Sequence, residues 1–146
     1  MSYEMCNLHR SLVNQRLTGT VPRQLAKLTQ LTGIWLDHNS LTGSIPRDLA
    51  KLSELTVLSL RGNSLTGTIP SQIGRLSKLT TLRLEDNLLT GSFPSQLAAL
   101  PLLADLNLDY TYIEGAPGNP RVEKAVCWPG TDWPCAEPTR VIEAAE

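Results

Sequence analysis

The stretch that decides the fold is Leu31-Thr-Gly-Ile-Trp-Leu-Asp-His-Asn39-Ser-Leu-Thr-Gly43-Ser-Ile-Pro46-Arg-Asp-Leu49-Ala-Lys-Leu52-Ser-Glu54. The same pattern begins again at Leu55 and at Leu79, so that equivalent residues are 24 positions apart. Five glycines keep this step: Gly19, Gly43, Gly67, Gly91 and Gly115. Agreement at one fixed period indicates a repeat protein, in which each copy folds as one unit and stacks on the next.

Each copy begins with a short alternating segment. Ile34 and Leu36 alternate with polar or variable neighbours, and the equivalent pairs are Leu58 and Leu60, Leu82 and Leu84, and Leu106 and Leu108. Alternation with period two is typical of a strand with one buried face. The pattern predicts strands over about 33–37, 57–61, 81–85 and 105–109. These strands are expected to be parallel, because the chain returns in the same direction in every copy.

The rest of the unit has a predictable role for each residue type. Asn39, Asn63 and Asn87 end the strands, and a side-chain amide there can satisfy turn backbone groups that would otherwise be buried without partners. The following Thr-Gly allows unusual backbone angles, and the proline fixes an extended or turn conformation. The Leu49–Leu52 spacing suits one helical turn with both side chains facing inward.

This unit resembles that of the plant-type leucine-rich-repeat family, which includes receptor-kinase ectodomains and secreted inhibitors of pectin-degrading enzymes. The resemblance covers about residues 7–117, and its most specific part is the Leu-Thr-Gly-x-Ile-Pro box. It implies an α/β fold: a right-handed solenoid with a parallel β-sheet on the concave face and short helical turns on the convex face. We expect about five repeats in residues 1–117, the first and last degenerate, and a C-terminal cap and tail in residues 118–146.

The tail resembles the C-terminal cap of the extracellular members of this family. Gly118-Asn119-Pro120 precedes Cys127 and Cys135, which are eight residues apart. The resemblance implies a disulfide between these two cysteines and an extracellular or cell-surface location. The first residues lack the apolar stretch of a signal peptide and the chain has no Asn-x-Ser/Thr sequon, so a cytoplasmic location stays open. Cys6 is left without a predicted partner in the chain.

Solenoids bind through the outward-facing positions of their sheet. Here the candidate residues on the concave face are Trp35, Asp37, His38, Ser59, Arg61, Arg83, Glu85, Asp86, Asn107, Asp109 and Tyr110. We expect these positions to be solvated, which makes Trp35 the informative one, since an exposed indole is an apolar area that a partner can cover. The alternative is that Trp35 packs over a neighbour such as Arg83 or Ser59. The charged residues form either a recognition strip or a solvated face with cross-strand ion pairs.

An enzyme is not expected. His9 and His38 are the only histidines, no serine or cysteine spacing requires a contact with them, and no Cys-x-x-Cys metal motif or phosphate-binding glycine loop is present. No cofactor is predicted. The net charge of −1 gives no reason to expect nucleic acid, and no apolar segment is long enough to span a membrane.

The predicted function is therefore recognition of a protein or peptide, or of a glycan, by a receptor-like module. The alternatives are a secreted inhibitor of a cell-wall-degrading enzyme and an intracellular scaffold. The first repeat lacks a recognisable cap, so its edge could also associate with a second copy of the chain.

Overall fold

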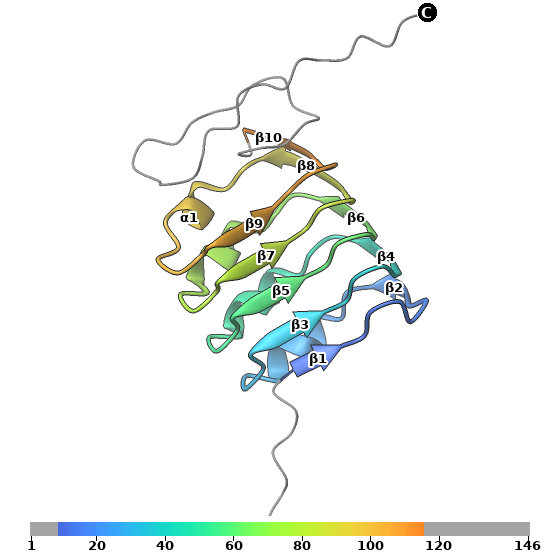
Figure 1. The fold of residues 1–146 in the computed structure, drawn as a ribbon, viewed down its shortest axis with the longest axis horizontal. Helices are drawn as coiled ribbons and strands as arrows, with labels where there is room; N and C mark the ends of the chain where they lie inside the picture. The colour runs from blue at the N-terminus through green and yellow to red at the C-terminus, as the bar shows by residue number, and fades with distance from the viewer. Residues whose placement is uncertain (1–8, 116–146) are drawn as a thin grey trace, which may run out of the picture.

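The computed structural model describes residues 9–115, which form a stack of similar coils (Figure 1). One side of the stack is a parallel sheet, the front sheet, with the strand order β1-β3-β5-β7-β9. Its strands are β1 (His9–Ser11), β3 (Gly33–Trp35), β5 (Val57–Ser59), β7 (Thr81–Arg83) and β9 (Asp105–Asn107). Parallel pairing in chain order confirms the prediction, although the strands are shorter than predicted. Even the degenerate first repeat supplies a strand.

A second parallel sheet, the back sheet, was not predicted. Its order is β10-β8-β6-β4-β2. The strands are β2 (Thr18–Thr20), β4 (Ser40–Gly43), β6 (Ser64–Gly67), β8 (Leu88–Ser92) and β10 (Tyr112–Glu114). The Leu-Thr-Gly box forms this sheet rather than a turn, because Leu41 points into the core between the exposed Ser40 and Thr42. At Gly43 a Cβ would lie 2.9 Å from the Thr20 methyl group, so glycine is needed for close packing of the repeats.

Helical turns close each coil. Three of them are 3-10 helices, η1 (Arg23–Lys27), η2 (Arg47–Lys51) and η3 (Ser71–Arg75), and the fourth is the short α-helix α1 (Ser95–Ala98). A proline with extended backbone precedes each one, as at Pro46, where φ is −67° and ψ is 124°. Leu49 and Leu52 are completely buried, which confirms that both face inward.

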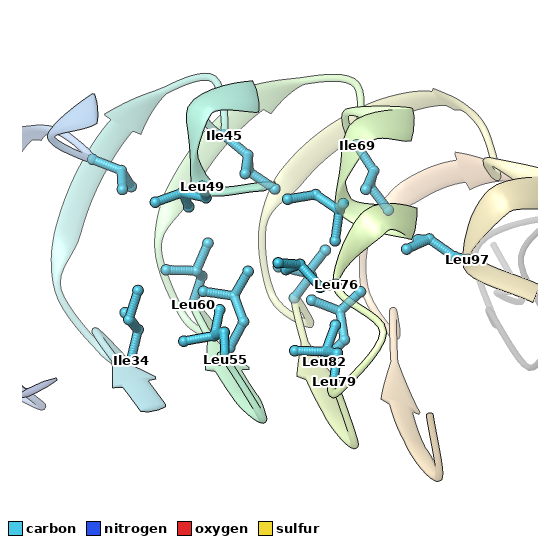
Figure 2. Close-up of a cluster of buried hydrophobic side chains, with 14 of the residues drawn as sticks. Ile34, Ile45, Leu49, Leu55, Leu60, Ile69, Leu76, Leu79, Leu82 and Leu97 are labelled. Atoms are coloured by element: carbon cyan, nitrogen blue, oxygen red, sulfur yellow. The ribbon is translucent and has the colours of Figure 1, made fainter. Parts of the chain in front are cut away.

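The core is a column of aliphatic side chains enclosed by the two sheets and the helical turns (Figure 2). Leu36, Leu60, Leu84 and Leu108 are buried in one row, as predicted. Each element packs against its counterpart in the neighbouring repeat, η1 on η2 and η2 on η3, as the sheets do strand by strand. The fold is therefore an α/β solenoid whose stability comes from contacts between neighbours.

The asparagines at the strand ends form the predicted internal ladder. The Asn87 amide donates to the carbonyl oxygens of Leu60 (2.9 Å), Leu84 (3.0 Å) and Glu85 (3.3 Å), and its oxygen accepts from the Leu65 N–H at 3.0 Å. Asn63 and Asn87 are buried, whereas Asn39 is half-buried. The prediction of a buried row is therefore wrong at Asn39.

The reason lies in the first repeat. There Gln15 replaces the expected asparagine, and its exposed side chain donates to the Val13 carbonyl at 3.0 Å. The predicted cap in residues 118–146 and the Cys127–Cys135 disulfide lie outside the described residues, as does Cys6.

Candidate functional site

The outer face of the front sheet carries the predicted site residues in register. Trp35 pairs with Ser11 on one side and Ser59 on the other, and Ser59 pairs in turn with Arg83. Arg83 then pairs with Asn107. The structure thus brings residues that are 24 positions apart into adjacent positions, as the repeat requires.

Beyond the strands, the columns continue through backbone hydrogen bonds. The His38 N–H donates to the Arg61 carbonyl at 2.9 Å, and the Asp86 N–H donates to the Asp109 carbonyl at 3.0 Å. Residues just beyond the ends of the strands are therefore still held in a regular array on this face.

One column has a backbone role that the sequence interpretation missed. Its members have left-handed backbone angles, with φ from 53° to 64°, and they are Asn14, His38, Gly62, Asp86 and Tyr110. Asn, Asp, His and Gly are the types that tolerate this conformation best, so their occurrence at one repeat position was a readable signal. The ring of His38 lies over Gly62, where a Cβ would be 2.6 Å from His38 Nδ1. His38, Asp86 and Tyr110 are exposed.

The expectation that these positions are solvated is wrong for three residues. Asp37, Ser59 and Glu85 are only 8%, 2% and 7% exposed. Ser59 is small and stands in register between two large side chains, Trp35 and Arg83, which accounts for its burial. Neighbouring copies therefore decide exposure here more than residue type does.

The buried residues Asp37, Ser59 and Glu85 form a network with the half-buried Arg61, and these four residues are called the central polar cluster. The Ser59 hydroxyl donates to Asp37 Oδ1 at 2.5 Å, and the Arg61 backbone N–H donates to the same oxygen at 3.2 Å. Arg61 Nε lies 3.5 Å from Glu85 Oε1. Arg61 and Glu85 make an ion pair, but within the described residues neither Arg61 Nε nor Glu85 Oε2 has a hydrogen-bond partner, although both atoms are buried.

Glu85 is the residue of the cluster whose ionised form is disfavoured by its surroundings. Burial raises the pKa of the Glu85 carboxyl group, and a hydrogen bond from its own backbone and the charges of Arg61 and Arg83 offset this only in part. A buried polar atom without a partner costs about 1–3 kcal/mol. A hydrogen-bonding group that reached Arg61 Nε or Glu85 Oε2 would therefore stabilise the cluster.

Ion pairs across the strands account for part of the charge on this face, as one of the two alternatives predicted. Arg83 contacts Asp105 Oδ2 through Nε at 2.9 Å and through a terminal nitrogen at 2.6 Å, and this partner raises the pKa of Arg83. The side chains of Arg83 and Asp105 are 46% and 39% exposed, so the pair is worth about 0–1 kcal/mol. Burial raises the pKa of Asp109, and the nearby Asp86 adds to this.

Trp35 itself is half-buried, between the exposed indole and the packed indole of the two alternatives. The residue stands beside the central polar cluster, since Ser59 of the cluster is its partner in β5. The two alternatives for Trp35 are therefore met in part each, because some of the indole is covered and some of it faces solvent.

Residues 9–115 bear on two further kinds of site, a metal centre and a membrane span. No group of three or more His, Cys, Asp or Glu side chains in this range could hold a metal ion. In the same range no helix has the length and apolar character needed to cross a bilayer.

Family models for the leucine-rich repeat match residues 30–52 and 53–113. The chain belongs to the leucine-rich-repeat family, and its structural neighbours include receptor-kinase ectodomains of plants, which confirms the plant-type resemblance. This fold generally serves binding rather than catalysis. No curated protein matches the chain.

Three solved structures illustrate the similarity. The ectodomain of the receptor kinase GASSHO1/SCHENGEN3 from Arabidopsis thaliana, in complex with CASPARIAN STRIP INTEGRITY FACTOR 2, is 40% identical with a TM-score of 0.66, over 67% of this chain and 12% of that one. A plant ice-binding protein is 37% identical with a TM-score of 0.65, and the match covers 67% of this chain and 32% of that one. The plant peptide hormone receptor RGFR1, in complex with RGF2, is 34% identical with a TM-score of 0.65, and the match covers 66% of this chain and 16% of that one. The chain thus spans about a third or less of these relatives.

Proposed function

We propose that this chain is an extracellular, receptor-like recognition module that binds a peptide or a segment of a protein on the outer face of its front sheet. The observation that carries the proposal is the half-buried Trp35 beside the central polar cluster, where Arg61 Nε and Glu85 Oε2 are buried without hydrogen-bond partners among residues 9–115. Buried polar atoms whose hydrogen bonds are left unmade concentrate at functional sites. Complexes of similar ectodomains, such as RGFR1 with RGF2, support a peptide as ligand.

The dimensions of the face fit such a ligand. Five parallel strands about 4.8 Å apart make a strip roughly 20 Å across. A peptide or one edge of a folded protein covers such a strip, whereas a large standard interface needs more area. An inhibitor of a secreted enzyme would use the same face, so receptor and inhibitor differ in the partner and not in the site.

The test is a random-peptide display selection on the immobilised protein. In parallel, the same library is selected on the Trp35→Ala variant, and on Ser71→Ala, an exposed position outside both sheets, as the matched control. We expect a peptide family enriched on the wild-type protein and on Ser71→Ala but not on Trp35→Ala. Equal enrichment on all three proteins would show that the front face is not the binding surface.

A second candidate function is favoured by the outer face of the back sheet. Exposed hydroxyl residues cover it from β2 to β8, and they are Thr18, Thr20, Ser40, Thr42, Ser44, Ser64, Thr66, Thr68, Thr90 and Ser92. The strands β2, β4, β6 and β8 contain no charged residue, and their spacing of about 4.8 Å repeats the hydroxyl groups regularly. A regular, uncharged array of hydroxyl and methyl groups suits the surface of ice, and one structural neighbour is an ice-binding protein.

This candidate is tested by an ice-recrystallisation assay on the wild-type protein, on Thr66→Lys and on Ser77→Lys, which places the same charge outside the sheet. Inhibition of crystal growth that is lost in Thr66→Lys and kept in Ser77→Lys would support ice binding. Crystal growth unaffected by the wild-type protein would exclude it.

Self-association through the first repeat remains a proposal as well. Leu12 and Leu28 lie at that end of the solenoid and are 42% and 43% exposed. Exposed leucines beside an edge strand favour contact with a second copy. Sedimentation equilibrium of the wild-type protein and of Leu28→Lys checks this: a dimer is expected for the first and a monomer for the second.

A further inference from the structure

The helical turns carry a row of cations on the side of the coil that lies away from the front sheet. This row, the helical stripe, consists of Arg23, Lys27, Arg47, Lys51 and Arg75 on η1, η2 and η3, and all five side chains are exposed. Because η1 packs on η2 and η2 on η3, the cations of successive repeats follow one another along the solenoid. Among the predicted site residues of the front face the balance is the opposite, with the four carboxylates of Asp37, Glu85, Asp86 and Asp109 against the two cations of Arg61 and Arg83.

The stripe is poorly neutralised by the protein. Asp48 is the one carboxylate on these three turns, and it pairs with Lys51 at 2.9 Å. Among the described residues no ion pair is formed by Arg23, Lys27, Arg47 or Arg75. The hydrogen bond and charge of Lys51 hold the pKa of Asp48 below its usual value, and the charges of Arg47 and Arg23 add to this. Cations from two neighbouring repeats therefore lie close enough to the Asp48 carboxylate to stabilise its charge together.

Three open grooves run between the repeats beside the stripe, with volumes of about 540, 520 and 360 Å³, and Arg47 lines all three. The first groove adds Arg23 and Gln24, and the third adds Gln72 and Arg75. Hydroxyl groups of the back sheet line the first two. Guanidinium groups bind carboxylates, while side-chain amides and hydroxyls donate and accept hydrogen bonds as sugar hydroxyls require.

We propose that the helical stripe binds an acidic polysaccharide, a linear chain that carries a carboxylate on successive sugars. One cation recurs at the last position of each 3-10 turn, as Lys27, Lys51 and Arg75, and Arg23 and Arg47 add a second one on the first two turns. A ligand with one anion per unit can therefore meet them in succession, and the amides between them contact its hydroxyl groups. This surface is separate from the front sheet, so one molecule can hold a wall or matrix glycan and a peptide at the same time. Because both charges of each contact stay near solvent, binding is expected to weaken as the salt concentration rises.

The experiment measures binding of a decamer of galacturonic acid by calorimetry at low and high salt. Its fully methyl-esterified form serves as the uncharged probe of the same chain. The variant Arg23→Gln/Arg47→Gln/Arg75→Gln removes three unpaired cations, and Arg16→Gln, an exposed arginine outside the helical turns, is the matched control. Thermal unfolding of both variants confirms that they are folded.

We expect the acidic decamer to bind the wild-type protein and Arg16→Gln equally, and the triple variant at least about tenfold more weakly. The esterified decamer should not bind. Equal affinity of the triple variant or of the esterified decamer would overturn the proposal. So would binding to vesicles of phosphatidylserine without binding to the decamer, since the stripe would then face a membrane. The triple variant should still bind a peptide selected on the front face, which separates this result from the proposed function.

Discussion

Two columns of polar residues run side by side at the ends of the front strands, only two positions apart in each repeat: Asn39, Asn63 and Asn87 in one, and Asp37, Arg61 and Glu85 in the other. The amide column is satisfied, since Asn63 alone makes four hydrogen bonds to main-chain groups at 3.0–3.2 Å. The charged column leaves Arg61 Nε and Glu85 Oε2 buried without partners in the described part of the chain. The same backbone supports both columns, so the difference separates polar side chains whose hydrogen bonds the fold satisfies from the Arg61 and Glu85 side chains, whose hydrogen bonds it leaves incomplete.

The largest effect is expected in the amide column. Asn87→Ala removes the groups that satisfy three carbonyl oxygens and one N–H, which belong to two neighbouring repeats. We expect the free energy of unfolding to fall by about 3 kcal/mol, measured by urea denaturation. The control is Asn107→Ala, which removes one hydrogen bond to the Asp109 N–H and should cost about 1 kcal/mol. Similar losses at both positions would mean that the ladder is not special.

Trp35→Ala is expected to act on binding rather than on folding. Because the half-buried indole is the largest side chain beside the central polar cluster, its loss should weaken a selected peptide by about 2 kcal/mol, or thirtyfold in Kd. Stability should fall by less than about 1 kcal/mol. Calorimetry and urea denaturation give the two numbers, with Ser71→Ala unchanged in both. A variant that does not fold would place the indole in the core and remove it from the site.

Glu85→Gln tests whether the charged column burdens the fold. The folded state has the higher pKa, so the wild-type protein loses stability as pH rises from below about 4.3 through the raised pKa, where the unfolded chain ionises first. Glutamine does not titrate. The free energy of unfolding of the variant, relative to that of the wild-type protein, should therefore rise by up to about 1 kcal/mol between pH 3.5 and pH 7. Urea denaturation at both pH values measures this. If the variant instead becomes less stable than the wild-type protein as the pH rises to 7, the ion pair of Glu85 with Arg61 stabilises the fold.

The smallest effects are expected at the exposed charges of the face. Arg83→Ala and Asp86→Asn should each change peptide affinity by about 0.5 kcal/mol, and the change should shrink at high salt because both groups are solvated. Asparagine is chosen at position 86 because it tolerates the φ of 56° found there. Calorimetry at two salt concentrations measures both. Effects that do not depend on salt would mean that these side chains shape the face instead.

The sequence predicted what one repeat encodes by itself. The alternation of Leu58 and Leu60 specified a front strand, and Asn63 specified its end, because period and residue type suffice for both. It did not predict the back sheet, since Ser64-Leu-Thr-Gly67 is too short to distinguish a strand from a turn. The sequence also did not predict which side chains of the front face are buried. Whether Ser59 is covered depends on the size of Trp35, 24 residues away, and on how its ring lies.

The central claim, that the front face is the binding surface, is tested most directly by hydroxyl-radical footprinting with a peptide selected on the wild-type protein. Trp35 on the front sheet and Tyr112, half-exposed on the back sheet, are two oxidisable rings on different faces of one molecule. Mass spectrometry gives the oxidation rate of each ring with and without the peptide. The account predicts that the peptide slows oxidation of Trp35 several-fold and leaves Tyr112 unchanged. Protection of Tyr112 with no change at Trp35 would contradict it.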